Sequence, residues 1–137
     1  SKPSTPEVFW LPATELHAKL AAKEFSCKEL TKEWLKRLEK LGPKYNALAL
    51  SLRKPAIDRA KDIDKELKRG RTRGPLQGVP YGAKDLLSFA KFPTRWGAKP
   101  FEGQKFDEHA AAIQKLQSQR QGGDVPRSAA GRRENAW

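Results

Sequence analysis

A lysine stands inside a glycine-punctuated, mostly apolar stretch of the sequence, "GPLQGVPYGAKDLL" at residues 74–87. Burial disfavours a charged ammonium group, so a lysine enclosed by apolar neighbours can present a neutral amine that acts as a general base. The small residues Gly82 and Ala83 directly before Lys84 would let other reactive groups approach closely, and Asp85 is expected to accept structural hydrogen bonds beside the site. The alternative is a lysine at the end of a short strand that reaches solvent, and residue types alone favour that alternative.

The other reactive side chains lack partners at useful spacing. Cys27 is the single cysteine, which excludes an internal disulfide, and no histidine is near it in sequence, so we interpret it as a packing residue. His17 and His109 are separated by most of the chain and have no partner at ligand spacing, so we expect no metal site and no cofactor. The loop "RGRTRG" at 69–74 is basic but lacks the spacing of a phosphate-binding loop, and we expect it to be solvated.

The composition allows one domain with a small core. Of the 137 residues, 37% are hydrophobic and 32% are charged, and the net charge is +12. A positive balance attracts nucleic acid, anionic membranes or acidic partners, but we favour an ordinary solvated lysine-rich surface as its explanation. No apolar run is long enough to span a bilayer and no secretory signal is present, so we expect a soluble, cytoplasmic protein without membrane contact. The sequence begins with Ser1 instead of Met, which is compatible with an upstream segment.

The clearest helix is predicted over residues 26–41. Ser26 and Glu29 have the spacing of a capping box, in which each side chain satisfies a free backbone N–H group of the other residue. Gly42 is expected to provide a left-handed cap, because Pro43 cannot continue the helix. One face of this helix carries an apolar stripe made of Leu30, Trp34, Leu38 and Leu41.

Three more helices and two strands are expected. Helices are predicted at 14–24, from Pro55 to Gly70, and near 107–117. Short apolar segments at 47–52 and 79–83 predict buried strands, the second of which ends at Lys84. This alternation is typical of an α/β domain.

The residues around Lys84 resemble a known family. "RGPLQGVPYGAKDLL", followed by "PTRWGAKPF", "FD" and a helix ending in "KL", is similar to the N-terminal part of the amidase signature family. This family of serine hydrolases includes amidases and the A subunit of glutamyl-tRNA amidotransferase. The upstream stretch "ELHAKLAAKEFSCKELTKEWLKRLEKLGPKYNAL" resembles the family's opening helical pair and the strand that follows. The resemblance covers roughly residues 14–117 and implies an α/β fold in which helices flank a mixed sheet, apparently truncated here.

The resemblance implies a role for Lys84 as the base of a Ser, cis-Ser, Lys triad that hydrolyses small-molecule amides, with Gly82 and Asp85 as supporting residues. In the family both serines come from a glycine- and serine-rich segment farther along the chain, which this sequence does not contain. The resemblance therefore supplies no nucleophile, and we expect this polypeptide alone to be inactive. His109 and Ala111 depart from the family's acidic residue and Thr at the start of the last helix, which puts the capping of that helix in question.

The predicted organisation has three parts: an N-terminal extension at 1–13, a partial amidase domain at 14–117 and an atypical polar tail at 118–137. The tail lacks periodicity, and we expect it to be disordered or to result from a shifted reading frame. The alternative function is a basic nucleic-acid-binding or scaffold module without catalysis. The tail contributes four arginines and two acids to the net charge of +12, so most of the positive balance belongs to the body, which favours an ordinary basic surface. No oligomeric state is predicted.

Overall fold

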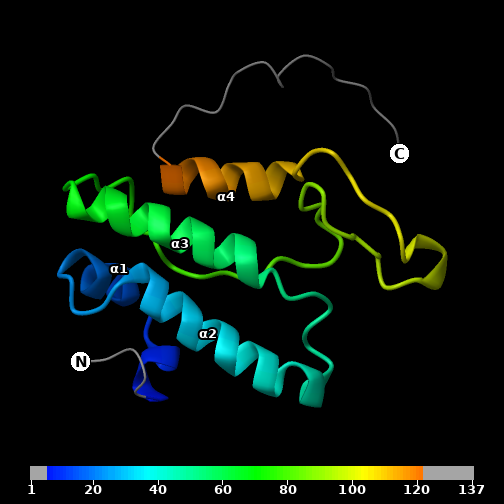
Figure 1. The fold of residues 1–137 in the computed structure, drawn as a ribbon, viewed down its shortest axis with the longest axis horizontal. Helices are drawn as coiled ribbons and strands as arrows, with labels where there is room; N and C mark the ends of the chain where they lie inside the picture. The colour runs from blue at the N-terminus through cyan, green and yellow to red at the C-terminus, as the bar shows by residue number, and fades with distance from the viewer. Residues whose placement is uncertain (1–5, 122–137) are drawn as a thin grey trace.

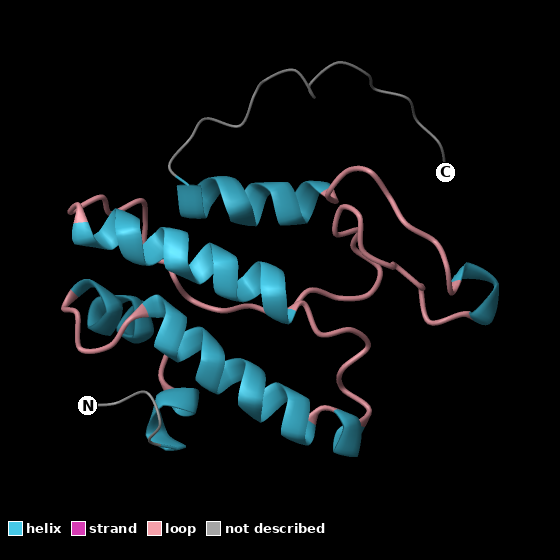
Figure 2. Cartoon of the chain, viewed as in Figure 1, coloured by secondary structure: helices cyan, strands magenta, loops and turns pink. Residues whose placement is uncertain are grey.

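The computed structural model describes residues 6–121 and is built from helices joined by loops (Figures 1 and 2). Helices α2 and α3 lie side by side and contact each other, with α1 at one end of the pair and α4 on the far side of α3 (Figure 1). The elements, in chain order, are η1 (Pro6–Trp10), α1 (Ala13–Ala21), α2 (Cys27–Leu41), η2 (Pro43–Tyr45), α3 (Arg53–Lys68), η3 (Lys99–Phe101) and α4 (Ala111–Gln121). The four predicted helices are thus all present, with boundaries shifted by a few residues.

The two predicted strands are wrong for the described part of the chain. Residues 47–52 are exposed or half-buried and form no strand, and 79–83 form an irregular segment without a ladder partner. Between residues 6 and 121 the β-pairing consists of one isolated antiparallel bridge, between Pro93 and Lys105. A strand needs a hydrogen-bonded neighbour, and these residues do not supply one. The mixed sheet of the expected α/β fold is therefore not observed.

The predicted capping box at the start of α2 is confirmed. Glu29 N donates to Ser26 Oγ at 3.1 Å, and Ser26 N donates to Glu29 Oε2 at 2.9 Å. A third side chain, which sequence spacing did not reveal, completes this cap from another helix. Asp64 of α3 accepts from the backbone N–H groups of Cys27 at 2.7 Å and Lys28 at 3.0 Å. The carboxylate thereby satisfies two of the unpaired donors at the α2 N-terminus and fixes α3 against it.

The predicted left-handed cap at Gly42 is wrong. Gly42 is right-handed, with φ −53° and ψ −49°, and the left-handed residue is Asn46, with φ 51°. The reason for glycine here is space: a Cβ atom at position 42 would lie 2.5 Å from Leu38 O and 2.7 Å from Leu48 Cβ. The chain after α2 therefore turns back tightly over the end of its own helix.

The core lies where α1, α2 and α3 meet. Leu30 of α2 is fully buried, Trp34 is half-buried against the core, and Leu38 is 40% exposed, so only the first half of the predicted stripe is packed. Phe9 of η1 meets the Trp34 ring edge-on, with centroids 5.1 Å apart, so residues before position 13 pack on this core too. The buried core residues are Val8, Leu16, Leu20, Phe25, Cys27, Leu30, Ala60 and Ile63.

Two further expectations concern the chain as a whole. Across residues 6–121, no helix combines the length and apolar character needed to cross a membrane. The predicted tail at 118–137 overlaps the end of α4, and from residue 122 onward it lies outside the described residues.

Candidate functional site

The segment that leads to Lys84 is anchored first by Gln77, whose side chain is fully buried. Its Oε1 accepts from Arg73 N at 2.8 Å, and its Nε2 donates to Glu66 Oε2 and to Arg71 O, both at 3.2 Å. The backbone carbonyl oxygen of Gln77 lies 3.0 Å from His17 Nδ1, which donates when that nitrogen carries the proton. One glutamine therefore holds the basic loop at 69–74 to α3 and α1. The Arg73 guanidinium also pairs with Glu66 at 2.9 Å, so part of the loop's charge is neutralised.

Gly78 seats the same segment on the core. Its φ of +85° lies in the left-handed region, and a Cβ atom there would be 2.8 Å from Leu20 Cδ1, 3.4 Å from Cys27 Sγ and 3.6 Å from Ile63 Cγ2. The Cys27 thiol donates to Gly78 O at 3.3 Å and is 2% exposed, in agreement with its interpretation as a packing residue. Glycine is required here both by the backbone and by the space available.

Lys84 itself is exposed, which agrees with the alternative of a lysine that reaches solvent. Within residues 6–121, no hydrogen bond or ion pair engages its Nζ, and its carbonyl oxygen accepts from Leu87 N at 2.9 Å. Gly82 and Ala83 are also exposed, and no atom of residues 6–121 lies within 4 Å of a Cβ built at Gly82. The open space that the sequence predicted around Lys84 is present, but the apolar enclosure is not, because no described element covers this side of the segment.

Asp85 connects the Lys84 segment to the following loop. Its Oδ1 accepts from the backbone N–H of Arg95 at 3.2 Å. The next residue, Trp96, has φ 52° and is 43% exposed, and its ring lies 4.9 Å from Phe101 and 6.0 Å from Phe106, measured between centroids. The carboxylate thus holds an aromatic loop beside the candidate base.

The start of α4, whose capping the sequence left in question, is held by contacts with the loop that precedes it. His109 Nδ1 accepts from Ala90 N at 3.0 Å, and Ala110 N donates to Ser88 O at 2.9 Å. The His109 ring also lies 4.5 Å from Phe89. This histidine fastens the loop after Lys84 to the last helix. No group of three side chains that could hold a metal ion occurs within residues 6–121.

A groove of about 510 Å³ runs between α2, α3 and the segment from Gly78 to Ala83. Its walls are largely apolar, with Trp34, Leu35 and Leu38 on α2 and Gln117 of α4 at its edge. Ala83 lines one wall of this groove, and Lys84 is the next residue in the sequence.

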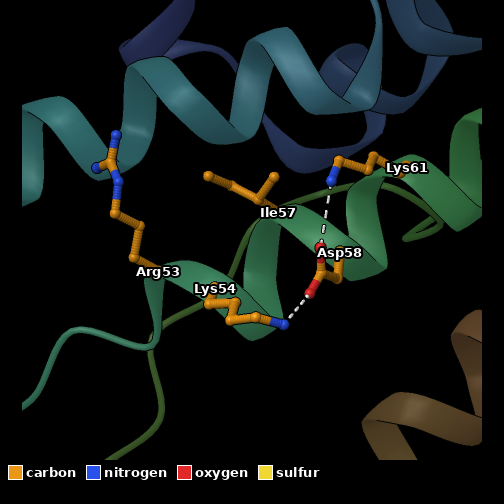
Figure 3. Close-up of a pocket in the computed structure, with 5 residues that line it drawn as sticks. All are labelled: Arg53, Lys54, Ile57, Asp58 and Lys61. Atoms are coloured by element: carbon orange, nitrogen blue, oxygen red, sulfur yellow. Dashed lines mark hydrogen bonds and ion pairs between the residues drawn. The ribbon is translucent and has the colours of Figure 1, made fainter.

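A second, shallower depression lies on α3 and is lined by charged residues (Figure 3). Asp58 accepts from Lys54 at 2.8 Å and from Lys61 at 3.2 Å, and Arg53 pairs with Glu39 of α2 at 2.7 Å. The hydrogen bond from Lys54 holds the pKa of Asp58 below its ordinary value, with Lys61 adding to the effect, and the hydrogen bond to Asp58 raises the pKa of Lys54. These cations are already paired, which argues against an anion-binding surface here.

Comparison with known proteins locates the chain in a family. The model of the Amidase family matches residues 29–121. The A subunit of the glutamyl-tRNA(Gln) amidotransferase of Carboxydothermus hydrogenoformans is 34% identical over 110 residues, which are 80% of this chain and 23% of that protein. The acylamidase of Rhodococcus erythropolis is 30% identical over 107 residues, 78% of this chain and 22% of that protein. The chain therefore spans less than a quarter of the length of these relatives.

A solved structure shows the same fold. It comes from a study of a vestigial protein complex and the origins of an s-triazine catabolic enzyme, and it superimposes with a TM-score of 0.76 at 24% identity. The match covers 80% of this chain and 24% of that chain. The helical arrangement described above is thus found inside a larger protein. The match of the family model over residues 29–121 shows that the chain belongs to the amidase family.

Proposed function

We propose that Lys84 is the general base of an amide-hydrolysing site, the lysine of a Ser, cis-Ser, Lys triad, and that the substrate is a small-molecule amide. The observation that carries the proposal is the position of Lys84. It stands in the sequence that resembles the family motif, on an exposed segment fixed by Gln77, Gly78 and Asp85, with its Nζ free of partners within residues 6–121. A lysine side chain that no acid of its own body engages is free to meet a serine brought against it, and burial by the covering part would favour the neutral amine that accepts the serine's proton.

These 137 residues alone supply only the base. Hydrolysis of an amide in this way also needs a nucleophilic serine and donors that stabilise the oxyanion of the tetrahedral intermediate. We propose that the partial amidase domain at 14–117 acquires activity only when the serine-bearing remainder of an amidase fold covers Lys84. The apolar enclosure that the sequence predicted would then come from that remainder.

The supporting residues have distinct roles in this proposal. Gly82 leaves space for the serines, since nothing lies within 4 Å of a Cβ at that position. Asp85 positions the loop that follows Lys84 and takes no part in the reaction, because its Oδ1 accepts a hydrogen bond from Arg95 N at 3.2 Å. The isosteric change Asp85→Asn keeps an acceptor oxygen and should retain most activity, whereas Asp85→Ala should lose more.

The experiment uses a joined protein, in which residues 1–121 of this chain precede the part of the R. erythropolis acylamidase that follows its matched segment. Amine release from small amides is measured for this protein and for the 137-residue chain alone. We expect activity in the joined protein and none in the chain alone. Folded joined protein without activity, or activity in the chain alone, would contradict the proposal.

A further inference from the structure

The two histidines of the chain use the same ring nitrogen in opposite ways. His17 Nδ1 lies 3.0 Å from the backbone carbonyl oxygen of Gln77, so it must carry the proton to make a hydrogen bond. His109 Nδ1 lies 3.0 Å from the backbone nitrogen of Ala90, whose N–H can only donate, so this ring nitrogen must be unprotonated. The positively charged imidazolium carries a proton on both nitrogens and has no acceptor. Protonation therefore preserves the His17 contact and breaks the His109 contact.

The His109 contact joins the loop at 84–92 to the start of α4. The His109 ring is half-buried and meets the Phe89 ring edge-on, with centroids 4.5 Å apart. Because this packing holds the ring in place, a protonated Nδ1 would direct its N–H at the N–H of Ala90. Two donors at hydrogen-bonding distance repel each other, so the loop and the helix must then separate or the ring must turn away.

We propose that His109 is a pH-sensitive switch in this fold, whose protonation at mildly acidic pH releases Ala90 and loosens the loop at 84–92 from α4. Histidine is the side chain whose charge ordinarily changes between about pH 5 and pH 8. The hydrogen bond from Ala90 stabilises the contact at the alkaline end of that range, and this stabilisation is lost as the pH falls through it. The inference concerns the fold and does not depend on the proposed catalytic role of Lys84.

The charged groups around this contact balance one another. Those on the loop, before α4 and on the first turns of α4 are Lys84, Asp85, Lys91, Asp107, Glu108 and Lys115. Lys91 Nζ is ion-paired with Asp107, and Asp85 already accepts from the backbone of the next loop. The other three side chains are exposed, where solvent screens them. Since three cations face three anions, the direct effect of protonating His109 falls on its hydrogen bond.

Hydrogen exchange of the Ala90 amide in the 137-residue chain tests the switch. Each rate is divided by the intrinsic rate of an unprotected amide at the same pH, which gives a protection factor. The protection of Ala90 should be about two- to tenfold lower at about pH 5 than at about pH 8, as the loss of one hydrogen bond implies. The Leu30 amide, which donates to Ser26 O at 3.1 Å in α2, should keep its protection. A fall of equal size at Leu30 would mean general unfolding and would overturn the inference.

Two variants separate the switch from packing. His109→Gln keeps an acceptor oxygen that does not titrate between about pH 5 and pH 8, so the protection of Ala90 should no longer depend on pH. His109→Phe keeps an aromatic ring beside Phe89 but has no acceptor, so the protection of Ala90 should be low at both pH values. Constant Ala90 protection in the folded wild-type chain, or the wild-type pH dependence in His109→Gln, would contradict the proposal.

Nitrogen-15 NMR of the imidazole rings gives a readout that needs no variant. Near pH 8, His109 Nδ1 should have the chemical shift of an unprotonated ring nitrogen, with His17 Nδ1 as the internal reference for a protonated one. A neutral His109 ring with its proton on Nδ1 would overturn the inference, because that tautomer cannot accept from Ala90.

Discussion

Replacing Gly78 with alanine tests whether the Lys84 segment is seated on the core as described. The new Cβ would lie 2.8 Å from Leu20 Cδ1, which is closer than any ordinary contact, and the backbone would keep a φ of +85°. The left-handed conformation costs a residue with a Cβ about 1–2 kcal/mol. Overpacking a core costs about 1–3 kcal/mol. Together, Gly78→Ala should reduce the free energy of unfolding by about 2–5 kcal/mol, a large share of the ~5–15 kcal/mol typical of a domain.

The matched control is Gly82→Ala, four residues along the same segment. Gly82 has no atom within 4 Å of an added Cβ and is not left-handed, so its substitution should change the free energy of unfolding by less than about 0.5 kcal/mol. Urea denaturation of the 137-residue chain followed by circular dichroism measures both. Equal stability of the two variants would refute the seating of the segment by Gly78.

Three other predictions concern the cap of α2, the buried Gln77 and the pairing of Glu39. Asp64→Ala removes the cross-helix cap of α2 and should cost about 1–2 kcal/mol, whereas Asp62→Ala, which breaks only an exposed pair, should cost less than about 1 kcal/mol in the same denaturation assay. Gln77→Leu leaves the part-buried hydrogen-bonding partners of this side chain unpaired and should lower the free energy of unfolding by about 2 kcal/mol or more. A urea midpoint equal to that of the wild type would contradict the role of Gln77. The hydrogen bonds from Ser51 and then Arg53 hold the pKa of Glu39 below its ordinary 4.5, so the stability it contributes is present above pH 4.5 and is lost as the pH falls through the lowered value. The melting temperature of Glu39→Gln should therefore fall below wild type at about pH 7, and the gap should close as the pH falls below the lowered pKa of Glu39; a gap that persists below that pKa would exclude this origin.

Local signals in the sequence predicted the helices well. The capping box of Ser26 and Glu29 is confirmed because its two partners are three residues apart and need nothing beyond the helix itself. The long-range contacts could not be predicted in the same way. Asp64 caps a helix whose start is 37 residues away, and Gln77 meets His17 from 60 residues away. In the sequence, only the glycines on either side of "PLQ" indicated that the backbone around Gln77 is constrained.

The failed predictions have a common physical cause. An apolar run such as 47–52 becomes a strand only beside a hydrogen-bonding neighbour, and no such neighbour exists within residues 6–121. Lys84 is likewise exposed because burial needs a covering element. The left-handed cap expected at Gly42 followed from residue type, whereas the position actually demands glycine because Leu38 O and Leu48 Cβ leave no space. The donors Trp34 Nε1 and Arg59 Nη2 could not be predicted to lack acceptors within residues 6–121, because only the placement of these side chains reveals it.

The measurement that tests the central claim most directly is kcat/KM for amide hydrolysis by the joined protein with Lys84→Ala, compared with Lys68→Ala. Lys68 is exposed near the end of α3 and outside the groove, so its substitution controls for the loss of one positive charge. Loss of a general base lowers the rate by about 10²- to 10⁴-fold. We expect a fall of that size for Lys84→Ala and an unchanged value for Lys68→Ala. Equal activity of the two folded variants would show that Lys84 is not the base.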